Sequence, residues 1–146
     1  MIQVRKFSLG DLHAIRKIEK ESLFDGSPRP LERYFQKYPD EFMVAQQDEK
    51  ILGYIIGRTK DNGSARIAWL AVLPSCRGKG VGRKLLEYLL NHFEDRGIKK
   101  VFLFVRTHNT PAISLYEKVG FTILRKVEKY YRNGNDAFVM RKFMDA

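Results

Sequence analysis

Hydrophobic and polar positions along the chain repeat with two periods, one typical of β-strands and one typical of α-helices. Short runs rich in β-branched and aromatic residues, each bounded by turn residues, predict strands. These strands are expected at residues 3–7, 42–47, 51–58, 65–73, 101–105, 121–131 and 137–143. The run at 101–105 is almost wholly apolar, which predicts a strand buried on both faces beside a parallel neighbour.

Apolar residues three or four positions apart predict helices between these strands. Ser8 and Asp11 give a loose capping pattern for a first helix, and a second helix is expected over residues 31–38. After the fourth strand, a longer helix is predicted to end at Gly97. Its apolar stripe consists of Val81, Leu85, Leu86, Leu89, Leu90 and Phe93.

The remaining elements complete a single α/β domain. A short helix is expected to be capped by Thr110 and to stop at Gly120. The last two strands are predicted to form a hairpin around residues 132–135. The order is two helices, an antiparallel meander, a glycine loop and helix, a strand, a helix and a C-terminal hairpin. It predicts a mixed sheet in one domain over residues 1–146.

Charge and cysteine content narrow the chemistry and the cellular location. The formal net charge of +10 should attract polyanions such as coenzyme A, RNA or a ribosome. The single cysteine, Cys76, cannot form an intramolecular disulfide, and we assign it no role. Neither a signal-peptide core nor a membrane-spanning apolar run is visible, so we expect a cytoplasmic protein that crosses no membrane. No metal site is expected, because the histidines are scattered over different elements: His13, His92 and His108.

A basic, glycine-rich stretch links the fourth predicted strand to the longer helix. It reads Arg77, Gly78, Lys79, Gly80, Val81, Gly82 and Arg83. Glycines at alternate positions leave the backbone open to a ligand, and the first N–H groups of the helix have no intrahelical partner. The helix dipole and the three cations also favour an anion. A plain strand-to-helix turn needs only one glycine and no cations, so the stretch predicts a phosphate or pyrophosphate site.

The spacing within this stretch excludes two common phosphate loops. A nucleoside-triphosphate loop would continue with Lys and Ser or Thr, whereas here Gly82 is followed by Arg83. A dinucleotide site would need an acidic residue closing the next strand, which closes with Arg106 instead. What remains resembles Arg/Gln-x-x-Gly-x-Gly/Ala, the acyl-coenzyme A loop of the GNAT superfamily of N-acetyltransferases. Arg77, Gly80 and Gly82 occupy its defining positions.

Residues 106–121 resemble the second signature of the same superfamily, in which Asn, then Ala-x-x-Leu-Tyr, then Gly-Phe recur. The matching residues are Asn109, Ala112, Leu115, Tyr116, Gly120 and Phe121. The predicted order of elements is similar to the GNAT fold over essentially the whole chain. The closing Lys129, Tyr130 and Tyr131, before a hairpin, look more particularly like N-terminal α-amine acetyltransferases, including RimI-type ribosomal-protein enzymes.

This resemblance implies acetyl-CoA as co-substrate, without a metal, held by residues 77–83 and by four further residues. Ala71 and Val72 match strand positions that offer a backbone N–H to the thioester carbonyl. Asn109 matches the asparagine that bonds the pantetheine arm, and Tyr116 matches the general acid beside the sulfur. Their plainer interpretations are two core strand residues, a loop asparagine and a core tyrosine with its hydroxyl at the rim.

The chain departs from the superfamily at the general base. RimI-like enzymes typically carry Glu, and some eukaryotic relatives His, where this chain has Phe104. Histone-type members place a Glu where this chain has Arg66. His108 lies in a predicted loop, and we expect it to serve that loop or solvent. Glu21 and Asp25 could reach the acceptor, although surface roles are expected for both.

We expect direct attack of an amine on the thioester, with the N-terminal α-amine of a protein or peptide as acceptor and a ribosomal protein as one candidate. Phe24, Tyr130 and Tyr131 would wall the acceptor site, although the two tyrosines could equally be ordinary strand aromatics. One alternative is a small-molecule amine or polyamine acetyltransferase, which would want acidic residues in its pocket. Another is a non-catalytic coenzyme A binding or nucleic-acid associated module. Nucleic acid is not required, and the chain lacks the aromatic and basic interleaving of an RNA platform.

Overall fold

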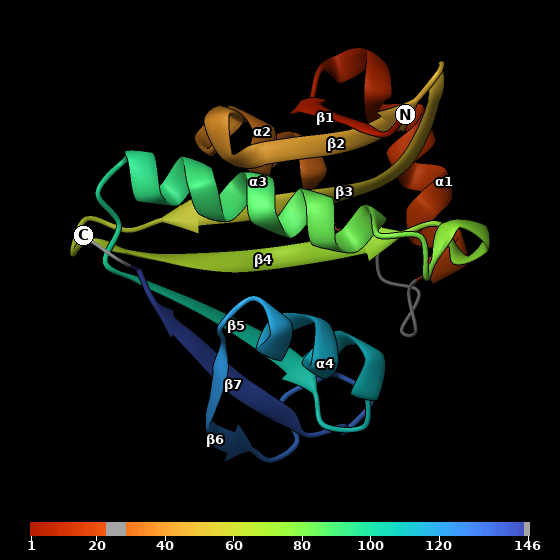
Figure 1. The fold of residues 1–146 in the computed structure, drawn as a ribbon. Coiled ribbons are helices and arrows are strands. Elements are labelled where there is room, and N and C mark those ends of the chain that lie inside the picture. The colour runs from red at the N-terminus through yellow and green to blue at the C-terminus, as the bar shows by residue number, and fades with distance from the viewer. Residues whose placement is uncertain (23–28, 145–146) are drawn as a thin grey trace.

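A computed structural model describes residues 1–22 and 29–144, which are organised around one seven-stranded sheet (Figure 1). The strands are β1 Gln3–Lys6, β2 Phe42–Gln47, β3 Lys50–Thr59, β4 Ser64–Val72, β5 Lys100–Arg106, β6 Thr122–Val127 and β7 Ala137–Phe143. Their spatial order is β1-β2-β3-β4-β5-β7-β6. Among these seven described strands, only β4 and β5 pair in parallel. The predicted mixed sheet and its antiparallel meander are confirmed.

Helices lie on both sides of this sheet. The described α-helices are α1 Leu12–Ser22, α2 Leu31–Lys37, α3 Val81–Asp95 and α4 Thr110–Lys118. α3 packs against the face that carries Gly57, where an added Cβ would lie 2.7 Å from Cζ of Phe93. α2 packs on the opposite face, where the guanidinium of Arg58 lies over the rings of Tyr34 and Tyr38. Within the described ranges, no helix is long and apolar enough to cross a membrane.

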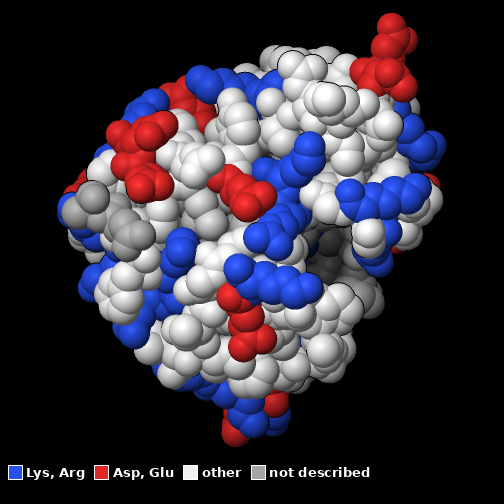
Figure 2. Space-filling view, viewed as in Figure 1, with Lys and Arg blue, Asp and Glu red and all other residues white. Residues whose placement is uncertain are grey.

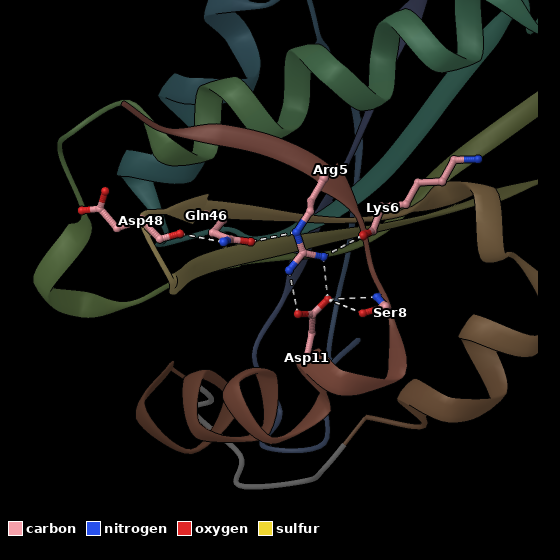
Figure 3. A network of polar contacts seen from close by, with 6 residues as sticks. All are labelled: Arg5, Lys6, Ser8, Asp11, Gln46 and Asp48. Atoms are coloured by element: carbon pink, nitrogen blue, oxygen red, sulfur yellow. Dashed lines mark hydrogen bonds and ion pairs between the residues drawn. The ribbon is translucent and has the colours of Figure 1, made fainter.

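The predicted capping pattern at Ser8 and Asp11 closes a short 3-10 turn, Leu9–Asp11, that leads into α1. The backbone N–H of Ser8 donates to Oδ2 of Asp11 at 2.9 Å. Arg5 of β1 donates to both oxygens of the same carboxylate, at 2.8 and 2.9 Å, and its Nε donates to Gln46 of β2 (Figure 3). One guanidinium therefore connects β1, β2 and the start of α1.

β4 and β5 pair over only four positions, from Ser64 with Lys100 to Ile67 with Leu103. Beyond them, β4 continues to Val72 and β5 to Arg106 without a mutual ladder. The sheet is therefore open between the C-terminal ends of its two central strands. The first turn of α3 and the N-terminal end of α4 lie beside this opening (Figure 1).

The structure corrects two strand predictions in the C-terminal half. On β5, Val101, Leu103 and Val105 are buried but Phe102 and Phe104 are only half-buried, so the predicted burial of both faces is wrong. The predicted strand over residues 121–131 ends at Val127. It ends there because residues 128–136 close on themselves: the N–H of Tyr131 donates to the carbonyl of Asn135 at 3.1 Å. Tyr130 and Tyr131 are therefore loop residues.

Candidate functional site

The glycine-rich stretch leaves its backbone open in the structure. Gly78 and Gly80 have φ values of +78° and +83°, which residues with a side chain rarely adopt. A Cβ at either position would have no neighbouring atom within 4 Å. Gly80 is the N-cap of α3, so the unpaired N–H groups of the first helical turn follow it directly. A phosphate could approach these donors without meeting a side chain.

Gly82 lies in closer surroundings than Gly78 and Gly80. A Cβ there would lie 3.4 Å from Cδ2 of Leu115 on α4 and 3.7 Å from Cγ2 of Val72 on β4, which are ordinary van der Waals contacts. The start of α3 therefore has room for a methyl group at this position but for little more. This agrees with the choice of Gly or Ala at the last position of the family loop.

The predicted cations remain available for an anion. Arg77 and Lys79 are exposed, and Arg83 makes a 3.6 Å ion pair with Glu87 across the exposed surface of α3. An exposed pair of this kind is worth at most about 1 kcal/mol and is easily exchanged for a phosphate contact. Figure 2 shows Lys and Arg side chains around a hollow, which lies below the N-terminal end of α3 when compared with Figure 1.

The last residues of β4 differ in where their backbone groups point. The N–H of Leu73 donates to the carbonyl of Leu52 on β3 at 2.8 Å. Backbone groups alternate in direction along a strand, so the N–H of Val72 points away from β3, into the opening. The backbone N–H of Ala71, which is paired with Tyr54, points toward β3 instead. Of the two predicted positions, Val72 is therefore the one whose N–H could reach a thioester carbonyl.

Asn109, and not Thr110, caps α4, which corrects the predicted cap. Its Oδ1 accepts the N–H of Ala112 at 3.3 Å, while Thr110 is already the first helical residue. Because capping uses only the side-chain oxygen, the Nδ2 hydrogens can still bond a ligand in the opening. The capping role and the predicted role toward the pantetheine arm are therefore compatible.

Tyr116 lies on α4 with only 8% of its surface exposed, and its ring meets Phe121 edge to face at 5.9 Å. Burial raises the pKa of its hydroxyl well above the usual range, and nearby Tyr131 adds to the increase. Tyr116 therefore stays protonated at any physiological pH. It is a core residue, as the plainer interpretation has it, and its protonated hydroxyl can donate a hydrogen bond.

The sequence did not predict that Arg66 and Phe104, which occupy the two positions where relatives carry a catalytic base, belong to one stack of side chains. The guanidinium of Arg66 lies 4.4 Å from the ring centre of Phe104 and donates to the Tyr130 hydroxyl at 2.9 Å. Tyr130 stacks on Phe104 at 4.4 Å, with an angle of 10° between the rings. Tyr131 meets Tyr130 at 90° and packs under Arg106 at 4.0 Å. The contact depends on the parallel register of β4 and β5, for which the sequence contained no signal.

The other candidate bases do not join this stack. Glu21 is exposed at the end of α1, and His108 is exposed between β5 and α4. Asp25 and the predicted wall residue Phe24 lie outside the described residues. Cys76 is buried and free. Residues 1–22 and 29–144 contain no group of three or more His, Cys, Asp or Glu side chains that could hold a metal ion.

A cavity of about 690 Å³ lies elsewhere, between α3 and the end of α4. It shares only Arg83 with the predicted phosphate loop, and its lining mixes the cations of Arg83, Lys118 and Lys142 with the carboxylates of Glu87 and Glu94. These carboxylates offset two of the cations, whereas residues 77–83 contain no acidic side chain. The open backbone at Gly78 and Gly80 is therefore the better candidate for the phosphate site.

Comparisons with known proteins agree with this geometry. The Acetyltransferase (GNAT) family profile matches residues 12–121. An uncharacterized N-acetyltransferase of Methanocaldococcus jannaschii is 38% identical over 95% of this chain and 90% of its own. The catalytic subunit NAA20 of the Arabidopsis thaliana N-terminal acetyltransferase B complex is 34% identical over 97% of this chain and 85% of its own.

Two solved structures extend the comparison to the fold. Ard1 from Thermoplasma volcanium superposes with a TM-score of 0.94, at 29% identity, over 99% of both chains. The ribosomal-protein-S18-alanine N-acetyltransferase from Escherichia coli gives 0.86 at 27% identity, over 100% of this chain and 96% of its own. The chain belongs to the GNAT family. It is an acetyl-CoA dependent N-acetyltransferase.

Proposed function

We propose that this enzyme acetylates the N-terminal α-amine of a protein or peptide. The observation that carries the proposal is the stack of Arg66, Phe104 and Tyr130. A cation and a ring fill both positions at which related enzymes could hold a base, so an acceptor that arrives uncharged suits this site best. The relatives that are themselves N-terminal acetyltransferases support the same acceptor.

The residues of the opening would each do one part of the transfer. Bound acetyl-CoA supplies an acetyl group activated as a thioester. Residues 77–83 and the first N–H groups of α3 would hold its pyrophosphate. The N–H of Val72 would donate to the thioester oxygen, where negative charge develops. As the C–N bond forms and the C–S bond breaks, Tyr116 would donate its hydroxyl proton or a hydrogen bond to the sulfur, and the amine would lose its proton to water.

The charge around the acceptor favours a neutral amine. Arg66 and Arg106 both belong to the aromatic stack, and a nearby cation disfavours a second positive charge. A peptide α-amine has a pKa of about 7.7 to 8.0 and is partly neutral at pH 7, whereas lysine, near about 10.4, is not. The difference of roughly 2.5 units corresponds to about 3.5 kcal/mol in favour of the α-amine. The same cations disfavour a polyamine acceptor.

The experiment compares two peptides of matched composition across pH. One has a free N-terminus and no lysine, and the other has a blocked N-terminus and one lysine. We expect the free peptide to have the higher kcat/KM at pH 7, with a rise until its α-amine has titrated. Reactions without enzyme correct for spontaneous acetylation at high pH. A better rate with the blocked peptide at neutral pH would show that an unidentified base serves lysine.

Two finer expectations stay predictions. The likeness to the Escherichia coli ribosomal-protein enzyme supports a ribosomal protein as one candidate acceptor. The sequence also predicts that the enzyme is cytoplasmic, and in the cytoplasm it would encounter such an acceptor. Mass spectrometry of N-terminal peptides from cells with and without the enzyme would identify the acceptors.

A further inference from the structure

Cations and aromatic rings interleave across the strands of one sheet face, although they do not do so along the chain. At one level of the sheet, Arg66 of β4 is paired with Phe102 of β5, and Phe102 is paired with Arg141 of β7. At the next level, Lys100 is paired with Phe143. Side chains of paired positions point to the same face. We call these five residues, together with Arg125 of β6 as a sixth, the basic sheet face.

This surface is accessible and lies on the side of the sheet away from α3 and α4. Phe102 alternates with Val101 and Leu103, which are buried on the α3 side. Phe143 is 59% exposed, and the guanidinium of Arg141 lies over its ring at 4.5 Å. The helices on this side, α1 and α2, pack on β3 and β4. On this side Phe102 and Arg141 are half-buried, and Lys100, Arg125 and Phe143 are exposed, while Val139 of β7 is buried between them and Phe104.

The charge of the surface has one sign. β4, β5, β6 and β7 contain no Asp or Glu at any position. A small cavity of about 150 Å³ continues the basic sheet face at the start of β5, where Lys99 joins Lys100 and Phe102 in its lining. A net charge of +10 strengthens the attraction for a polyanion.

We propose that the basic sheet face binds single-stranded nucleic acid. The exposed ring of Phe143 has Arg141 over it, and the half-buried Phe102 is paired with Arg66 and Arg141. Rings with cations beside them can stack a base and neutralise the adjoining phosphate. An acidic protein would use the cations but would gain nothing from rings alternating with them. The expectation that aromatic and basic residues do not interleave holds for the linear chain and fails for the folded sheet. The proposal does not depend on which amine the enzyme acetylates.

The test uses the full-length enzyme and a fluorescein-labelled, single-stranded RNA of twelve nucleotides and mixed sequence. Fluorescence anisotropy should show saturable binding at 50 mM salt, weaker binding as salt rises, and weaker binding to a duplex of the same sequence. Arg141→Gln should lower the slope of log affinity against log salt by about 0.7, the value for one phosphate of a single strand. Phe143→Ala should weaken binding about fivefold or more through lost stacking.

Matched controls lie on other parts of the surface. Lys50→Gln, at the start of β3, and Tyr88→Ala, on α3, remove an exposed cation and an exposed ring and should leave RNA affinity unchanged. Acetylation of a free peptide should be unchanged in Arg141→Gln and Phe143→Ala. If Phe143→Ala does not fold, Phe143→Leu removes the ring but keeps an apolar side chain at this position.

Four results would overturn the proposal. The first is that no RNA binding is seen at 50 mM salt, and the second is equal affinity for the single strand and the duplex. The third is complete displacement of the RNA by saturating acetyl-CoA, which would mean that the RNA binds at the phosphate loop. The fourth is equal competition by a polyglutamate peptide together with an unchanged affinity in folded Phe143→Ala and Phe143→Leu. That result would assign the surface to an acidic protein.

Discussion

Arg66 on β4 and Tyr130 in the loop after β6 are joined by a hydrogen bond of 2.9 Å, although 64 positions separate them in the chain. The bond fixes the loop against the ring of Phe104 and so shapes the proposed acceptor wall. A carboxylate at position 66 would remove the donor to the Tyr130 hydroxyl, and one at position 104 would remove the ring on which Tyr130 stacks.

The wall predicts a graded response at Tyr130. Tyr130→Ala removes the stacked ring and should raise KM for a peptide about tenfold or more, which is about 1.4 kcal/mol. Tyr130→Phe keeps the ring and loses only the bond from Arg66, so a change of about two- to fivefold is expected for this exposed site. Steady-state kinetics measure both, and KM for acetyl-CoA should stay constant. Equal KM values in the two variants would remove the ring from substrate binding.

A substitution at Gly80, compared with a matched one elsewhere, can distinguish a loss of cofactor binding from the effect of backbone strain. Gly80→Ala should weaken acetyl-CoA binding at least tenfold, because its Cβ would enter the space left for the phosphate. Gly63→Ala is the matched control, since Gly63 has a φ of +81° and equally open surroundings in a distant turn. Both variants should lose similar thermal stability, and only Gly80→Ala should lose affinity in calorimetric titration. Unchanged affinity in a folded Gly80→Ala would contradict the phosphate site.

Tyr116 should act through its hydroxyl alone. Tyr116→Phe keeps the ring against Phe121 and should lower kcat by about two to four orders of magnitude while affinity for acetyl-CoA changes little. Because burial raises the pKa of Tyr116, the wild-type kcat should not fall between pH 7 and pH 10 through loss of this proton. A variant with full turnover would exclude Tyr116 from the mechanism, and stopped-flow assays across pH would detect an early fall.

The carboxylate of Asp11 should control acid stability. Its bonds from Arg5 and from the Ser8 N–H lower the pKa of Asp11 in the folded state. This contribution is therefore complete above the ordinary carboxyl pKa of about 3.9 and is lost as pH falls through the lowered value. Asp11→Asn should destabilise the fold by about 1–2 kcal/mol at pH 7 and by much less at pH 2.

Asp40→Asn is the control for this prediction. Asp40 also pairs with a β1 cation, Lys6, but its side chain is 48% exposed, whereas that of Asp11 is 9% exposed. Urea unfolding at pH 7 should show the smaller loss for Asp40→Asn. Equal losses would mean that the bridge to β2 and α1 does not depend on burial.

The sequence predicted what depends on local pattern. The strand runs and the glycine-rich stretch at 77–83 follow from spacing within a few residues, and Tyr116 was singled out because its surroundings resemble the second family signature. Features that depend on register could not be predicted in this way. The contact of Arg66 with Phe104 needs the parallel pairing of β4 and β5, and the direction of the Val72 N–H needs the bond from Leu73. The choice of Asn109 over Thr110 as cap is a matter of side-chain geometry between two suitable residues.

The short ladder between β4 and β5 has a mechanical consequence. Within the sheet, four paired positions join one block, strands β1–β4, to a second block, strands β5–β7. Beyond Ile67 and Leu103, β4 and β5 are not paired, and we call this unpaired part of the boundary the seam. A molecule seated in the seam would touch both blocks and act as a brace between them. Each turnover would release the bound coenzyme A and leave the two blocks joined by the short ladder alone until the next acetyl-CoA binds. The rigidity of the sheet would therefore depend on the concentration of acetyl-CoA.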